Sequence, residues 1–140
     1  MSRRVIVAIP VVFGVVVLAS SFASAADPVV VNVPFGFTVR DTALPAGHYE
    51  IRAIGNLDEQ IQVRSLDAEK EAVTMVITRI ADARLKEPEV IFDKVDGAYV
   101  LSEVREPGID GFLVHATKGP HSKERVRGEV KSAHNVKRSS

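Results

Sequence analysis

Residues 29–39 read VVVNVPFGFTV, and every odd-numbered position in this stretch carries an apolar side chain. Such an alternation predicts a half-buried β-strand, because successive side chains of a strand point to opposite faces of the sheet. Pro34 lies on the other face and cannot donate a hydrogen bond to a neighbouring strand. The strand therefore either lies at a sheet edge near Pro34 or bends there and continues in a second sheet.

A second strand is expected at 48–54, and its pairing with the next strand can be derived from the hydrophobic pattern. An odd loop of three or five residues that contains a glycine would pair Ile51 with Ile61 and Tyr49 with Val63. An even loop would place these apolar residues opposite glutamines instead. We therefore predict an odd loop.

The dipeptide Asp-Gly at 96–97 is the strongest hairpin signal in the chain. A two-residue turn there places Phe92 opposite Leu101, and it lays the Lys94 side chain against Tyr99. This register is a specific expectation for the structure.

The stretch at 71–80 has apolar residues on both faces, which is typical of a central strand. A last short strand is expected at 111–116. About seven short strands, separated by turn signals, predict an antiparallel β-sandwich or a small barrel.

The first 25 residues have the pattern of an export signal. A basic start at 3–4 precedes an uncharged apolar run at 5–19, and Ala25 ends a small-residue cleavage site. We therefore expect a periplasmic or secreted protein that begins at Ala26. Two alternatives stay open: the uncharged stretch at 5–26 could act as an uncleaved anchor, and the paired arginines could direct twin-arginine export.

Composition and charge divide the rest of the chain into a β-domain at 26–118 and a basic tail at 119–140. No cysteine is present, so no disulfide supports the fold, and no thiolate can bind zinc or act as a nucleophile. Residues 26–117 carry 9 basic and 16 acidic side chains, net −7, whereas residues 118–140 carry 7 and 2, net +5. The body is acidic and the tail is basic.

The tail is expected to be flexible, because it has few apolar residues and a glycine inside its only helical pattern. Its cations could make weak contact with an anionic surface, or they could touch the acidic body. The tail lacks aromatic residues that stack on bases, so we expect no nucleic-acid partner. Its basic residues, counted from the end of the β-domain, are Lys118, Lys123, Arg125, Arg127, Lys131, Lys137 and Arg138.

Four short segments carry a resemblance to known proteins: VNVPFGFTV at 31–39, LPAGHY at 44–49, VIF at 90–92 and YVLS at 99–102. They are similar to segments of a group of small exported bacterial β-rich proteins of unknown function. The resemblance covers about 29–105. Those proteins typically carry a glycine where this chain has Arg40, and a glycine-rich or polar segment at 109–116. The resemblance implies the fold and no catalytic residue.

Residues that could support metal binding or catalysis are scattered along the sequence. The histidines have no second ligand at the spacing that metal sites favour, and they are His48, His115, His121 and His134. The carboxylates lack calcium-loop spacing and gather at Asp67, Glu69 and Glu71 and again at Glu87, Glu89, Asp93 and Asp96. Motifs for a serine nucleophile, a zinc protease or a phosphate-binding loop are missing. We therefore assign no catalytic, cofactor-binding or metal-binding residue.

The sequence as a whole predicts a non-enzymatic exported β-domain that acts, without a cofactor, as a binding or structural module of the cell envelope. A first alternative is a small barrel that carries an apolar ligand, although a barrel of this size is usually filled by its own side chains. Its lining would be Val31, Phe35, Phe37, Ile51 and Val63. A second alternative is a hydrolase that assembles carboxylates and histidines from distant strands.

Overall fold

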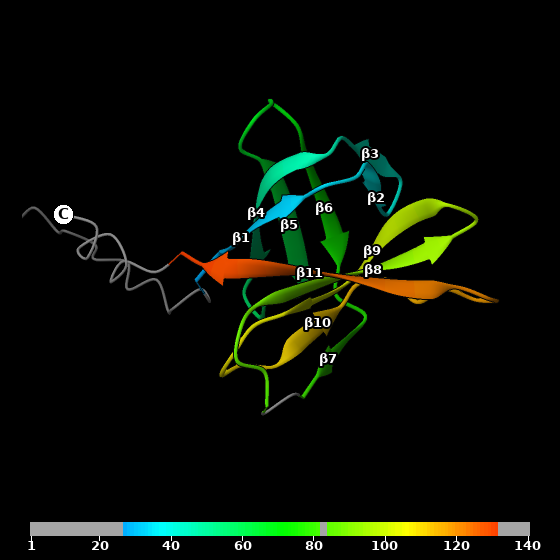
Figure 1. Cartoon of the computed structure of the whole chain (residues 1–140). Coiled ribbons are helices and arrows are strands. Elements are labelled where there is room, and N and C mark those ends of the chain that lie inside the picture. The colour runs from blue at the N-terminus through cyan, green and yellow to red at the C-terminus, as the bar shows by residue number, and fades with distance from the viewer. Residues whose placement is uncertain (1–26, 82–83, 132–140) are drawn as a thin grey trace, which may run out of the picture.

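The computed structural model describes residues 27–81 and 84–131, and the expected all-β fold is confirmed (Figure 1). The predicted export signal at 1–25 lies outside these residues. Within them, no helix that could span a membrane is found. The strands are β1 (Val29–Val33), β2 (Phe37–Val39), β3 (Thr42–Leu44), β4 (Gly47–Ile54), β5 (Gln60–Ser65), β6 (Glu71–Met75), β7 (Thr78–Ile80), β8 (Glu89–Val95), β9 (Ala98–Arg105), β10 (Gly111–Leu113) and β11 (Ser122–Val130).

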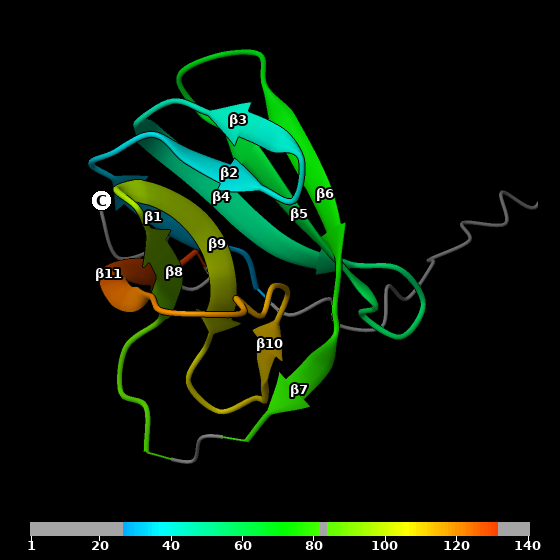
Figure 2. The ribbon, with the colours of Figure 1, turned by 90° about the vertical axis from the view of Figure 1, so that its right-hand side faces the viewer.

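These strands form one curved, nearly closed sheet with the order β3-β2-β9-β8-β11-β1-β4-β5-β6. Neighbouring strands are antiparallel except β2 and β9, which run parallel. β10 pairs with β9, and β7 pairs with β10. Figure 2 shows β10 and β7 as a small extension below the main sheet. The count exceeds the seven strands predicted because two long stretches are each divided in two and because β3 and β11 were not predicted.

The first of these divided stretches is the alternating segment at 29–39. β1 pairs with β4 and β11, whereas β2 pairs with β3 and β9. Of the two possibilities for Pro34, the structure therefore shows the bend into a second part of the sheet. The alternation is kept across the bend, and the buried residues are Val29, Val31, Val33, Phe37 and Val39.

The hairpin of β4 and β5 has the predicted odd loop, five residues long at 55–59, and it contains Gly55. The same faces pair as expected, but the partners are shifted by two residues. Ile51 lies opposite Val63, and Tyr49 lies opposite Ser65. The predicted partners are wrong because three-residue and five-residue loops give the same facing pattern.

The hairpin of β8 and β9 agrees with the sequence prediction. Phe92 lies opposite Leu101, and Lys94 lies opposite Tyr99 with its Nζ 5.4 Å from the ring centroid. At 96–97 both residues have positive φ values, 50° and 83°, as a type I′ turn requires. A register shift between Ile91 and Phe92 brings Glu103 opposite Ile91.

The prediction of one central strand at 71–80 is wrong. The stretch is divided into β6 and β7, and β6 ends the main path of the sheet with β5 as its only paired neighbour among the described strands. Only Ala72 and Thr74 of β6 are buried, whereas Val73 and Met75 are exposed. Apolar residues on both faces therefore mark an edge strand with an uncovered face in this case.

The prediction of a flexible tail from residue 119 is wrong for 122–130, which form β11 between β1 and β8. Two neighbouring strands supply backbone hydrogen bonds to a segment with little apolar surface of its own. Gly128 allows close approach, since a Cβ there would lie 2.7 Å from Val29 Cγ1 and 3.0 Å from the Val30 carbonyl oxygen. The β-domain therefore extends to Val130, and residues 132–140 lie outside the described part of the chain.

One core joins the apolar faces of the sheet. Phe37 meets Tyr49 and Phe92 edge to face, with both centroid distances 5.1 Å, and Phe35 stacks on Tyr99 at 3.7 Å. In the alternative of a barrel that carries an apolar ligand, five residues are expected to line the ligand site. All five belong to this core or pack against it: Val31, Phe35, Phe37, Ile51 and Val63.

Candidate functional site

The basic residues of β11 face acidic residues of the body. Arg125 Nη1 lies 3.2 Å from Glu89 Oε2, and Arg127 Nη1 lies 3.5 Å from Glu87 Oε2. Arg125 and Glu89 sit on adjacent, antiparallel strands (Figure 1). Glu87 and Glu89, two of the carboxylates considered as calcium ligands, are thus paired with arginines.

The most buried charged group, here called the Asp93 cluster, comprises Asp93, Glu103, Thr117, His121 and Lys123. Lys123 Nζ lies 3.4 Å from Asp93 Oδ1 and 3.6 Å from Glu103 Oε2. The Thr117 hydroxyl donates a 2.7 Å hydrogen bond to Asp93 Oδ2, and His121 Nε2 lies 3.8 Å from Asp93 Oδ1. The cluster therefore joins β8, β9, β11 and the segment that precedes β11.

The electrostatics of the cluster favour a charged Asp93. Burial acts to raise the pKa of this carboxyl, but the Thr117 hydrogen bond, the Lys123 cation and the neighbouring His121 side chain outweigh it and lower the pKa below its ordinary value. Both carboxylate oxygens are engaged. The arrangement fastens 117–123 to β8 and leaves Asp93 poorly placed to act as a free base.

A second charged group surrounds Glu50, whose carboxylate is buried on β4. Arg52 contacts Oε1, Arg64 lies 3.5 Å from Oε2, and Lys131 lies 3.9 Å from Oε2. Lys131 follows β11, so this group ties the end of that strand to the β4–β5 hairpin.

Asp67, in the β5–β6 turn, pairs with His48 of β4. Asp67 Oδ2 accepts a 2.7 Å hydrogen bond from the His48 backbone N–H and lies 3.1 Å from His48 Nδ1. The backbone hydrogen bond is the main reason why the pKa of Asp67 is lowered. Ser65 Oγ accepts hydrogen bonds from the Asp67 and Ala68 backbone N–H groups. Ser65 thus caps the turn.

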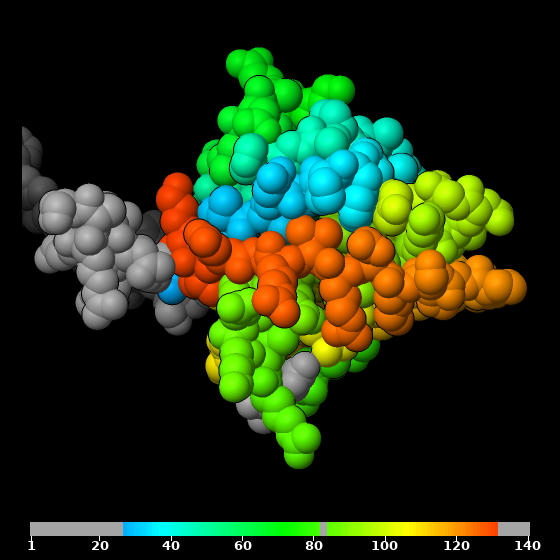
Figure 3. All heavy atoms as spheres, viewed as in Figure 1, coloured from blue at the N-terminus to red at the C-terminus, as the bar shows by residue number. Residues whose placement is uncertain are grey.

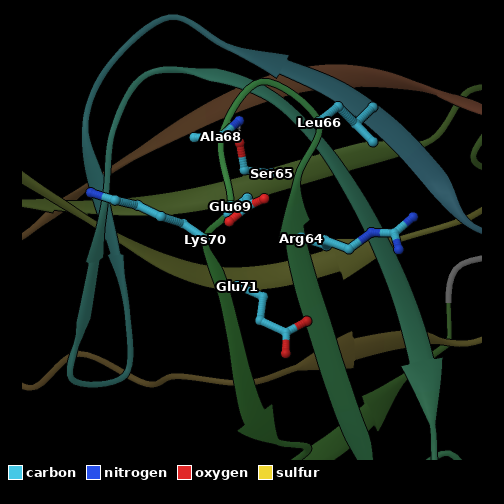
Figure 4. A pocket seen from close by; sticks show the side chains of 7 residues that line it. All are labelled: Arg64, Ser65, Leu66, Ala68, Glu69, Lys70 and Glu71. Atoms are coloured by element: carbon cyan, nitrogen blue, oxygen red, sulfur yellow. Dashed lines mark hydrogen bonds between the residues drawn. The ribbon is translucent and has the colours of Figure 1, made fainter.

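An open hollow of about 490 Å³ lies at the same turn (Figure 4). Figure 4 shows Arg64 and Glu71 on adjacent strands below the turn, with Lys70 pointing to the opposite side. The lining of the hollow carries positive and negative side chains and is mostly exposed. The hollow is therefore better suited to contact a polar molecule at the surface than to enclose it. The residues of the lining are Arg64, Ser65, Leu66, Ala68, Glu69, Lys70 and Glu71.

Among the described residues, His121 lies with Asp93 and Glu103 in the Asp93 cluster, whereas His48 and Asp67 form a separate pair. Within residues 27–81 and 84–131, no three His, Asp or Glu side chains are placed to hold a metal ion. The His115 carbonyl accepts a 2.8 Å hydrogen bond from the Ser102 hydroxyl, and His134 lies outside the described residues. Asp96 lies in the β8–β9 turn and is exposed.

No protein-family model, no curated protein and no solved structure matches this chain.

Glu106 is a titratable residue that the sequence analysis did not single out. Burial, together with the negative charge of Asp27, raises its pKa to about 7. It follows β9 and precedes Pro107, which lines an open hollow of about 600 Å³ beside the end of β11. No motif marks this residue, because its environment is formed by segments far apart in the sequence.

The outer face of β6 presents the most distinctive exposed apolar surface. Val73 is 42% exposed and Met75 is 47% exposed, and Ile77, two residues beyond the end of the strand, is 59% exposed. On the neighbouring strand Gln62 lies opposite Val73, and Gln60 lies opposite Met75. We call Val73, Met75 and Ile77 the β6 stripe.

Proposed function

We propose that this chain is an exported, non-enzymatic β-domain that binds an extended segment of another envelope protein along the β6 edge. The observation that carries the proposal is the β6 stripe on a strand that ends the main path of the sheet. An edge strand with an apolar face is a template for the addition of a further strand.

The backbone of β6 supports the same proposal. The Ser65 N–H donates to the Lys70 carbonyl, so in this antiparallel ladder Ala72 and Thr74 are the residues that exchange hydrogen bonds with β5. The intervening residues Val73 and Met75 direct their N–H and C=O groups away from β5. A partner strand would meet these groups and the two apolar side chains together.

Two features favour a protein partner over the alternatives of a carried ligand or a hydrolytic reaction. The residues offered as the lining of an apolar ligand site pack against one another in the core. The carboxylates and histidines offered for hydrolysis are engaged in separate groups, such as Asp67 with His48 and Asp93 with Lys123. Apolar surface free for contact lies on the outside of the sheet.

The envelope location rests on the export signal at 1–25. Cleavage after Ala25 would leave a chain that begins at Ala26. Mass spectrometry of the protein recovered from the periplasmic or secreted fraction tests this directly, because an uncleaved anchor would retain the mass of the signal and remain with the membrane.

Site-specific photo-crosslinking tests the binding surface. A photoreactive residue at Val73 should give a discrete crosslinked product in cells that export the chain, whereas the same residue at Asp96, in the β8–β9 turn, should not. The double change Val73→Lys and Met75→Lys, with the photoreactive residue moved to Glu71, should abolish the product. It should alter the unfolding free energy by less than about 0.5 kcal/mol, because both side chains are exposed. Equal crosslinking from positions 73 and 96, or a product that survives the double change, would refute the proposal.

A further inference from the structure

β11 combines a central position with little burial. It is the longest strand, with nine residues, yet none of them is buried. Val126 is its one residue that packs, partly buried, against the core. In Figure 3 the atoms of β11, in orange to red, cross the visible face of the molecule without cover from another strand. Its attachment therefore depends on backbone hydrogen bonds to β1 and β8 and on ion pairs.

The ion pairs and the close approach at Gly128 select what can occupy this position. Lys123 faces Asp93, and Arg125 faces Glu89. A larger residue than glycine at 128 would meet Val29. The groove between β1 and β8 is thus complementary to one particular sequence, which every copy of this chain carries.

The connection before β11 has a fixed part and an open part. Its fixed part is held because the Val114 N–H donates to the Ser102 carbonyl and the Thr117 hydroxyl donates to Asp93. Beyond Thr117, the residues at 118–120 are exposed, and Gly119 has a φ of 90° and no atom near the position of a Cβ. His121, whose Nε2 lies 3.8 Å from Asp93 Oδ1, would leave its place together with β11. A change of backbone angles there would release β11 while the fixed part stays in place.

We propose that β11 is exchanged between two copies of this chain, so that Ser122–Val130 of each copy occupies the groove between β1 and β8 of the other. All contacts that β11 and His121 make within one copy can be made between copies, and only the connection at 118–120 changes conformation. The partner is a second copy, because the groove requires glycine at 128 and cations opposite Glu89 and Asp93. This proposal is independent of the β6 edge.

The absence of cysteine from the sequence makes a direct crosslinking test possible. Glu89 lies opposite Arg127 in the ladder, and the neighbouring pair is hydrogen bonded through the Gly128 N–H and the Pro88 carbonyl. Positions 89 and 127 are therefore a pair without mutual backbone hydrogen bonds, whose short separation suits a disulfide. Chains with Glu89→Cys alone and chains with Arg127→Cys alone are purified, mixed, incubated and oxidised.

Strand exchange predicts a disulfide-linked heterodimer at a yield at least fivefold above that of a control mixture of Arg127→Cys with Glu69→Cys, whose exposed position lies in the β5–β6 turn. Exchange should also be several times faster at high salt, because screening weakens the ion pairs that hold β11 in place. The double variant Glu89→Cys/Arg127→Cys reports whether the ladder is intact. If it forms its disulfide within single chains while the mixture gives no more heterodimer than the control, the proposal is overturned.

Deletion of Gly119 and Pro120 gives a second, independent measurement. With a shorter connection, β11 reaches the groove between β1 and β8 of its own copy less easily. Light scattering should therefore show a dimer fraction at least threefold larger than that of the unchanged protein. A folded deletion variant that remains entirely monomeric would count against exchange.

Discussion

Lys123 Nζ lies 3.4 Å from Oδ1 of Asp93, a carboxylate that is only 1% exposed. The same ammonium group lies 3.6 Å from Glu103, so one cation of β11 serves two buried carboxylates on β8 and β9. A segment that reads as a solvated basic tail thereby becomes part of the sheet.

Lys123→Ala should lower the unfolding free energy by about 1–2 kcal/mol, because it leaves two buried carboxylates with one cation fewer. The cost is below that of a fully buried pair, since the Lys123 side chain is partly exposed and screened by solvent. Urea unfolding at neutral pH measures it. Lys118→Ala is the matched control at an exposed position before β11, and a loss as large there would contradict the role given to Lys123.

Gly128→Ala should destabilise the protein by about 1–3 kcal/mol, because the added Cβ must displace Val29 or move β11 away from β1. Thermal and urea unfolding both report this change. Gly36→Ala is the control, since a Cβ there would meet its nearest atom, the Leu44 carbonyl oxygen, at an ordinary 3.6 Å. Equal effects at the two glycines would show that close approach at 128 is unimportant.

Arg40→Gly should stabilise the protein by about 0.5–1 kcal/mol. Arg40 has a φ of 57°, a conformation that costs an L-residue about 1–2 kcal/mol, and part of this gain is lost to the greater freedom of glycine in the unfolded chain. Asp41→Gly, one residue further along, should instead destabilise. A destabilised Arg40→Gly variant would refute the strain argument.

Stability should fall as pH rises from about 5 to 8, through the titration of Glu106. Its pKa of about 7 in the folded protein exceeds the ordinary value of 4.5, so the folded state binds more protons in this window and loses that advantage as pH rises. Because Glu106 is only half-buried, we discount for solvent screening and expect about 1–2 kcal/mol.

The comparison with Glu106→Gln isolates this effect, since the variant should show a flatter pH dependence over the same range. Asp93, whose pKa is lowered, affects stability only at more acidic pH, where protonation would remove its pairing. Identical pH profiles for the two proteins between pH 5 and 8 would eliminate Glu106 as the cause.

Local sequence signals predicted the parts of the fold that depend on neighbouring residues. The Asp-Gly turn at 96–97 specified the register of β8 and β9, and the parity of the hydrophobic pattern specified an odd loop between β4 and β5. The same pattern could not distinguish three loop residues from five, because both place Ile51 on the same face. An apolar face that is buried and an apolar face that stays exposed look alike in a sequence. The residues of β6 therefore predict a central strand, although one of its faces is exposed.

The candidate sites were less accessible from the sequence. The sequence showed an acidic body and a basic tail, and contact between them was one of the open possibilities. It did not show that Arg125 and Glu89 would face each other on paired strands. The environment of Glu106 depends on Asp27, which lies at the other end of the domain in sequence, so no local pattern could reveal its raised pKa.

The amino-acid sequence alone specified most of the strands, the Asp-Gly turn and the division of charge, because these follow from the chemistry of residues that are close together along the chain. The place of β11 between β1 and β8 became evident only in the tertiary structure. A strand without buried residues is stable only where two other strands hydrogen bond to its backbone and where Asp93 and Glu89 form ion pairs with its cations. Those partners exist only once the rest of the sheet has folded.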